Sequence, residues 1–221
     1  MRRSRTLPRA MVVAGLALAL TGCSGPAGSG TVETSAPAAA SPTPAAVVLW
    51  PAPPDPMERT VAAGLEPEPQ EHTANHVHAH VDVFVDGKPI TIPAGIGIDI
   101  ESPDVRTFDE PDGSVSYGGI ERCATPCISP LHTHFASGIV HTESKTPEPN
   151  TLGQFFTEWG VALTDSCVGE FCSPKPIEFY VDGAPYTEDP TAIALTDQKE
   201  IAIVIGTPPA EIPKTADFSK E

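Results

Sequence analysis

Residues 76–85 read HVHAHVDVFV, so polar and apolar side chains alternate along most of this stretch. Successive side chains of a β-strand point to opposite faces. The alternation therefore predicts a strand with His76, His78 and His80 on one face and small apolar residues facing a core. The Val-Asp-Gly at 85–87 predicts a hairpin, because Asp-Gly suits the positive φ angles of a type I′ turn. We therefore expect the fold to contain a β-sheet with histidines on one of its faces.

Residues 176–190 (PIEFYVDGAPYTEDP) repeat the same pattern, in which an alternating strand runs into Val-Asp-Gly and then a second extended piece. The likeness to 80–93 indicates either an internal duplication or two hairpins that share only a turn type. Residues 200–206 (EIAIVIG) are an apolar run of strand length, which predicts a central strand.

Residues 151–160 (TLGQFFTEWG) predict the main helix. Thr151 and Gln154 stand in the register of a capping box. Apolar side chains then follow at helical spacing and are expected to pack in the core: Leu152, Phe155, Phe156 and Trp159.

A shorter helix is predicted at 55–64 (DPMERTVAAG), with Asp55 as N-cap, Glu58 completing a capping box and Gly64 at its end. This helix opens the folded part of the chain. We expect a single domain over 55–221, which is long enough to bury one ordinary core.

The order of these elements favours an α+β fold, in which a β-grasp-like mixed sheet packs on one main helix. A long insertion at 104–150 carries histidines and cysteines. A cupredoxin-like or cupin-like β-sandwich is the alternative, because both of those folds carry histidines on strands. The well-marked helix at 151–160 favours the α+β class.

The N-terminus is typical of an export signal. Four arginines precede an apolar run at 10–20, which is too short to span a bilayer as a mature helix. The run ends in Leu20-Thr21-Gly22-Cys23, which resembles the lipobox of bacterial lipoproteins. We therefore expect a lipoprotein signal peptide at 1–22, a lipidated Cys23 and a Pro-, Ala- and Ser-rich linker over 23–54. An ordinary secretory signal is the alternative.

Cleavage at that point removes four arginines and no acidic residue, so the formal net charge changes from −16 to −20. Such an acidic chain repels the phosphate backbone, which excludes nucleic acid as a partner. The predicted membrane attachment is then the lipid on Cys23. The domain is expected to be extracytoplasmic and anchored to the cell membrane by that lipid.

The four remaining cysteines are Cys123, Cys127, Cys167 and Cys172. An even number of cysteines in an oxidising compartment predicts two disulfides. Their spacings permit two local bridges or crossed pairs, so all three connectivities stay open. A four-thiolate zinc site is the competing interpretation.

Six of the seven histidines lie in two short segments: His76, His78 and His80, and His132, His134 and His141. Histidines at alternate strand positions share a face, and imidazoles from neighbouring strands can converge on one ion. Glu143 follows His141 on the same face, as a ligand, a hydrogen-bond acceptor or a general base. We therefore predict a metal site, against the simpler interpretation of solvated polar strand faces, and leave His72 outside it.

The donor types narrow the choice of metal. The histidine segments contain no methionine, and the thiols are expected to be oxidised, so soft ligands for Cu(I) are missing. Imidazole ligands suit Cu(II) and Zn best, and they suit nickel and iron less well. The expected cofactor is Cu(II) or Zn.

Three motifs occur in order along 75–206: HVHAHVDVFVDGKPITIPAGIGI, LHTHFASGIVHTES and TLGQFFTEWGVAL. Together they resemble a family of uncharacterised extracytoplasmic bacterial and archaeal proteins and lipoproteins. The resemblance implies that the histidines are a shared feature of that group, and it implies no reaction. The chain has Phe135 where the group's pattern has a polar or acidic residue, which argues against a carboxylate ligand at that position.

Three functions fit these observations. The first is capture, buffering or delivery of the ion, with a metal-receiving protein as partner. The second is a metalloenzyme of the hydrolase or hydratase type, with Glu143 as base. No nucleophile elbow, phosphate loop or nucleotide fingerprint accompanies it. The third is a metal-free interaction module in which the histidines act as a pH switch.

Overall fold

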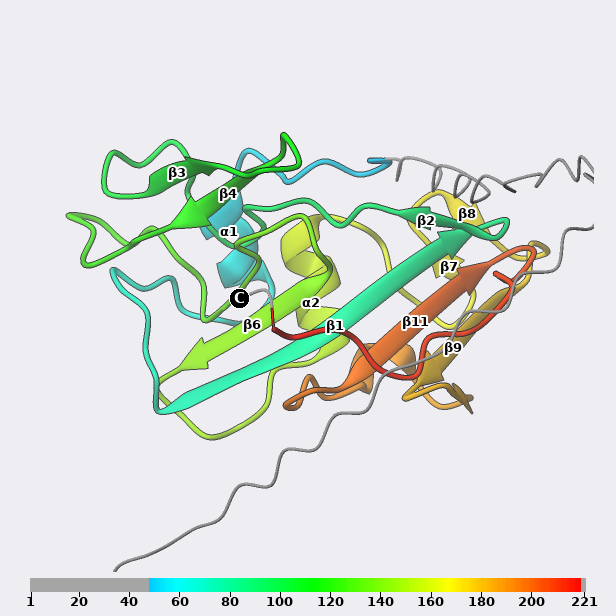
Figure 1. The fold of residues 1–221 in the computed structure, drawn as a ribbon. Coiled ribbons are helices and arrows are strands. Elements are labelled where there is room, and N and C mark those ends of the chain that lie inside the picture. Colours follow the sequence, from blue (N-terminus) through cyan, green and yellow to red (C-terminus); the bar gives the residue numbers. More distant parts are fainter. Residues whose placement is uncertain (1–47, 220–221) are drawn as a thin grey trace, which may run out of the picture. The chain divides into compact units, whose positions relative to one another are not determined.

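A computed structural model describes residues 48–219 of the chain (Figure 1). The predicted signal peptide, Cys23 and the first part of the linker lie outside the described residues. No helix of residues 48–219 has the length and apolarity needed to cross a membrane.

A mixed sheet with the strand order β10-β9-β11-β1-β6-β5 forms the centre of the fold, and β2 also pairs with β1. Its strands are β1 (Asn75–Val85), β2 (Lys88–Ile90), β5 (Leu131–His132), β6 (Ile139–Ser144), β9 (Ile177–Val181), β10 (Ala184–Tyr186) and β11 (Glu200–Ile205). Strands β1 and β11 run parallel, and the other neighbours are antiparallel. The prediction of a central strand near 200–206 is confirmed, because β11 lies between β1 and β9.

Both Val-Asp-Gly segments make tight hairpin turns. Asp86 and Gly87 have φ angles of 49° and 77°, and Asp182 and Gly183 have 51° and 76°. Positive φ at both central residues is the signature of a type I′ turn, whose twist matches that of the flanking strands. The predicted β1–β2 and β9–β10 hairpins are therefore confirmed.

Helix α2 (Leu152–Trp159) covers one face of the sheet. In Figure 1 it lies behind β1 and β6. The helix begins with the predicted capping box of Thr151 and Gln154 and ends at Gly160, which has a φ of 74°. Its apolar side chains pack on the alternate residues of the strands that face it: Ala79, Val81, Val83, Val140, Ile201, Ile203 and Ile205. The opposite face of the sheet is therefore the one that carries the histidines of β1.

Helix α1 (Pro56–Ala62) forms where it was predicted, but its start is different. Within the described chain, the Asp55 side chain makes no capping hydrogen bond. It accepts a hydrogen bond of 2.8 Å from Nε of Arg59 instead. The predicted capping box with Glu58 is therefore wrong, because the guanidinium one turn further along takes the Asp55 carboxylate.

The insertion at 104–150 contributes two strands, β5 and β6, to the main sheet. It begins with a ribbon of β3 (Arg106–Asp109) and β4 (Val115–Gly118), and the Cys123–Cys127 disulfide follows. This disulfide belongs to a small core of its own with Ile98, Val105, Ile120 and Ile128. The chain then returns to the main sheet, where β6 pairs with the first half of β1. The fold is α+β, as predicted, and the β-sandwich alternative is not required.

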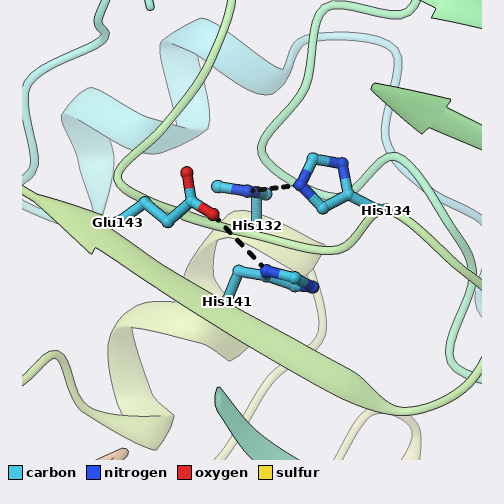
Figure 2. A group of neighbouring side chains, drawn as sticks. All are labelled: His132, His134, His141 and Glu143. Carbon is cyan, nitrogen blue, oxygen red and sulfur yellow. Dashed lines mark hydrogen bonds and ion pairs between the residues drawn. The ribbon is translucent and has the colours of Figure 1, made fainter. Parts of the chain in front are cut away.

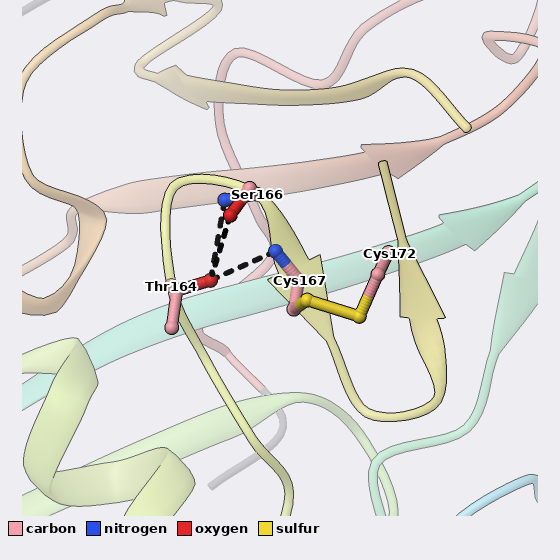
Figure 3. Close-up of a disulfide and its surroundings, with 4 residues drawn as sticks. All are labelled: Thr164, Ser166, Cys167 and Cys172. Atoms are coloured by element: carbon pink, nitrogen blue, oxygen red, sulfur yellow. Dashed lines mark hydrogen bonds between the residues drawn. A yellow bond between two sulfur atoms is a disulfide. The ribbon is translucent and has the colours of Figure 1, made fainter. Parts of the chain in front are cut away.

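A second disulfide joins Cys167 and Cys172 across the short ribbon of β7 (Cys167–Val168) and β8 (Phe171–Cys172), as Figure 3 shows. Oγ1 of Thr164 accepts hydrogen bonds from the backbone N–H of Ser166 at 3.2 Å and of Cys167 at 2.8 Å. Both bridges are thus local, and all four cysteines are used in them. The four-thiolate zinc site and the crossed pairings are wrong.

Trp50 joins the end of the linker to this part of the domain. Its ring lies edge-on to Trp159 and Phe171, with ring centroids 5.6 and 6.2 Å away. Its Nε1 donates to Glu170, and its carbonyl accepts from Nε1 of Trp159. Trp50 therefore packs on the folded domain. A short 3₁₀ helix, η1 (Pro190–Ala192), precedes β11.

Candidate metal centre

Strand register brings the two histidine segments together. In the antiparallel β1–β6 pair, His78 stands opposite His141 and His76 stands opposite Glu143. On the other side of β6, His132 of β5 also stands opposite His141. Residues directly opposite each other in a sheet share a face, so these side chains gather on one surface. We call His76, His78, His132, His134, His141 and Glu143 the histidine cluster.

His132 and His134 face each other with an Nε2–Nε2 distance of 3.1 Å (Figure 2). Nδ1 of His132 lies 2.9 Å from the carbonyl oxygen of Ser129, and Nδ1 of His134 lies 2.6 Å from that of Tyr117. A carbonyl can only accept, so both Nδ1 atoms are donors, and in a neutral ring Nε2 then carries the lone pair. Two lone pairs at this distance repel each other unless a positive charge lies between them.

A proton is poorly suited to supply that charge. His132 has no exposed surface, and its burial, followed by the neighbouring His134 and His141, lowers its pKa well below 6.5. Burial, followed by His141, also lowers the pKa of His134 to about 4. Both rings are therefore neutral near pH 7. Two imidazoles bound to one ion at 2.0–2.1 Å place their nitrogens about 3.3 Å apart at a tetrahedral angle, close to the spacing of this pair.

His141 lies at the centre of the cluster. Its ring centroid is 5.3 Å from that of His132, 4.6 Å from that of His134 and 4.4 Å from that of His78. Within residues 48–219, both of its ring nitrogens are buried and have no hydrogen-bond partner. Nδ1 lies 3.6 Å from Oε1 of Glu143, which is longer than a hydrogen bond (Figure 2). Buried nitrogens of this kind are costly to leave unpaired, which makes His141 a strong ligand candidate.

His76 and His78 form a second facing pair, again with an Nε2–Nε2 distance of 3.1 Å. Nε2 of His76 also lies 3.2 Å from Oε1 of Glu143. Burial, followed by His141 and His76, lowers the pKa of His78 to about 4. The His76 side chain is 43% exposed, so this side of the cluster opens to solvent.

Glu143 supplies the negative charge of the cluster. Its burial opposes ionisation, but its interactions with the neighbouring imidazoles of His141, His76 and His134 outweigh that effect and lower its pKa. The ligand atoms of His132, His134, His141 and Glu143 all lie within 4.8 Å of one another, and so do those of His76, His78 and His141. Three or four imidazole and carboxylate donors at this spacing fit a transition-metal ion.

His80 does not join the histidine cluster, although it lies on the same face of β1. Its Nδ1 is 2.9 Å from Oε2 of Glu200, and its Nε2 is 3.0 Å from the carbonyl oxygen of Ser137. Burial opposes its charge, but Glu200, Asp82 and that carbonyl outweigh the burial and raise its pKa. His80, Asp82 and Glu200 form a separate group of possible ligands in which both ring nitrogens already contact acceptors.

Sequence reasoning missed Glu71, whose Oε1 lies 3.9 Å from Nε2 of His134. Burial, followed by the charge of Glu143, raises its pKa. Glu71 lies just after a proline-rich approach and outside any periodic pattern, so no local signal marks it. Phe135 is half-buried beside His134, with ring centroids 6.5 Å apart.

In comparisons with known proteins, no family model, curated protein or solved structure matches this chain.

Proposed function

We propose that this protein binds Cu(II) or Zn through the histidine cluster and serves to capture, buffer or deliver the ion. The observation that carries the proposal is the pair of Nε2 lone pairs on His132 and His134, which face each other at 3.1 Å while both Nδ1 atoms are held by backbone carbonyls. This arrangement fixes the tautomer of each ring and aims its free nitrogen at one point, as the hydrogen-bond acceptors behind metal-bound histidines do.

The donor set supports Cu(II) or Zn over softer ions. All four cysteines of the domain are in disulfides, and Met57, the one methionine of residues 48–219, lies on α1. Imidazole and carboxylate donors suit Cu(II) and Zn, whereas Cu(I) prefers thiolate and thioether ligands.

The exposed edge of the cluster supports exchange of the ion with a partner. His132 is fully buried, whereas His76 is open to solvent. An ion entering from solvent therefore meets His76 and His78 first. A metal-receiving protein would contact the same edge. We place this exchange outside the cytoplasm, on a domain held at the membrane by a lipid on Cys23.

The two other functions are less well supported. A hydrolase or hydratase needs Glu143 free to take a proton from a bound water, but its Oε1 lies 3.2 Å from His76 and 3.6 Å from His141. A metal-free module leaves the facing lone pairs of His132 and His134 without an explanation.

The test of metal binding is elemental mass spectrometry of the full chain, purified without a histidine tag after exposure to Cu(II) or Zn. We expect bound metal in the wild type and its loss in the double variant His132→Ala, His134→Ala. The matched control is His72→Gln, because His72 lies beside Glu68 and outside the cluster. A wild type that binds neither ion after dialysis would refute the proposal.

The anchor has its own test. We expect Cys23→Ser to move the protein from the membrane fraction to the soluble fraction of cells that export it. An unchanged membrane fraction would show that Cys23 does not attach the chain.

A further inference from the structure

The histidine cluster holds more donors than one four-coordinate ion can use. His132, His134, His141 and Glu143 already supply four ligand atoms. His76 and His78 remain, and their Nε2 atoms have the same 3.1 Å spacing as those of His132 and His134. Two His-x-His pairs of equal spacing therefore lie in one cluster.

His141 lies between the two pairs. Its ring is 4.4 Å from that of His78 on one side and 4.6 Å from that of His134 on the other. It belongs to both groups of converging ligand atoms, and both of its ring nitrogens are buried without a hydrogen-bond partner in the described chain. One bound ion would occupy one of these nitrogens and leave the other unpaired.

The two carboxylates of this region also lie one beside each histidine pair. Oε1 of Glu143 lies 3.2 Å from His76, and Oε1 of Glu71 lies 3.9 Å from His134. Each histidine pair thus has one acidic side chain beside it, and two nearby negative charges favour more than one cation. Two four-coordinate ions would find enough donors in these imidazoles and carboxylates if His141 served both.

We propose that the histidine cluster is a dinuclear centre, with one ion at His132 and His134, a second ion at His76 and His78, and the imidazole of His141 shared between them. This inference rests on the proposed metal binding. Each nitrogen of His141 coordinates one ion, and the ring proton leaves to solvent when the second ion binds. The inner ion is enclosed by the protein, whereas the outer ion, beside the exposed His76, is the one that exchanges.

The group of His80, Asp82 and Glu200 is a weaker candidate for the second ion. Both nitrogens of His80 already contact acceptors, so binding an ion there would break existing contacts. Substitutions of His76 and His78 separate the two locations, because these two residues contribute to only one of them.

The experiment is a Cu(II) titration of the metal-stripped full chain, with copper counted after gel filtration and the electron paramagnetic resonance signal recorded. We expect two coppers per wild-type chain and one per chain of the double variant His76→Gln, His78→Gln. Because a shared imidazole couples two Cu(II) spins, the wild-type signal should be far weaker than that of two isolated ions. The variant should show the full signal of one ion, and His72→Gln should behave as the wild type.

The outcomes separate the two proposals. One copper in both the wild type and the His76/His78 variant would overturn the second site and leave the proposed function standing. Two coppers with the full signal of isolated ions would overturn the sharing of His141. No copper in the wild type would overturn both proposals. Circular dichroism of each variant confirms that a lost ion reflects lost ligands and not a lost fold.

Discussion

Glu158 gives a prediction whose size follows from its surroundings. This residue of α2 has no exposed surface, and it accepts a hydrogen bond from Oγ of Ser129. Its second carboxylate oxygen has no hydrogen-bond partner among residues 48–219. Burial therefore dominates and raises its pKa to about 8, although Ser129 and Thr60 act in the opposite direction.

A raised carboxyl pKa makes the folded state less stable as the pH rises. Between the ordinary value of 4.5 and about 8, the unfolded chain releases this proton and the folded chain keeps it. Stability from this group is thus fully present below the unfolded pKa and is lost as the pH rises toward the folded pKa. At about 1.4 kcal/mol per pH unit, the loss from pH 5.5 to 7.5 amounts to about 3 kcal/mol.

The substitution Glu158→Gln removes the titration and keeps an acceptor for Ser129. We expect the stability of the variant relative to the wild type to improve by about 3 kcal/mol between pH 5.5 and 7.5. The assay is urea unfolding with a chelator present, so that metal binding does not contribute. Other titrating groups are common to both proteins and cancel. The control is Glu188→Gln, the same change of charge at an exposed residue. A constant stability difference between Glu158→Gln and the wild type at the two pH values would refute this reasoning.

Three further changes test other parts of the structure. Gly160→Ala should lower the free energy of unfolding by about 1–2 kcal/mol, because Gly160 ends α2 with a φ of 74°, a left-handed conformation that strains a residue with a side chain. An unchanged midpoint of urea unfolding would contradict a left-handed end to that helix. Trp50→Ala should lower the free energy of unfolding by roughly 2 kcal/mol, because it removes the contacts with Trp159 and Phe171. This loss is smaller than that for substitution of a fully buried aromatic residue. An unaltered thermal midpoint would show that Trp50 does not pack on the domain. Adding Cu(II) or Zn at a hundredfold excess over its Kd should raise the free energy of unfolding by about 2.7 kcal/mol, and a chelator should reverse the gain; in the His132→Ala, His134→Ala variant the gain should be smaller.

Local patterns in the sequence predicted the individual elements of the fold well. The Asp-Gly turns, the capping box of α2 and the apolar run of β11 each depend on a few neighbouring residues, and all were found where they were expected. The capping box of α1 failed because Arg59 competes for Asp55, and competition between side chains is not visible in a pattern of residue types.

Features set by distant pairings were harder to predict. Alternation showed that His76, His78 and His80 share a face, but only the register of β1 with β6 places His78 against His141. The sequence pattern also could not show that His80 stays outside the histidine cluster, because its partner Glu200 lies 120 residues away along the chain. The approach of Glu71 to His134 likewise depends on how segments far apart in the sequence fold together, which no spacing rule determines.

The parallel pairing of β1 with β11 has a consequence for the way the chain is assembled. The centre of the sheet joins the first long strand to the last one, so it cannot form until residue 205 is present. Such non-local closure slows folding, because a long loop must be ordered before its ends gain contacts. A fragment that stops before Glu200 would leave both β1 and β9 with an open backbone edge. Unpaired edges of this kind recruit other chains, so truncated products of this protein should aggregate and should not persist as partly folded monomers.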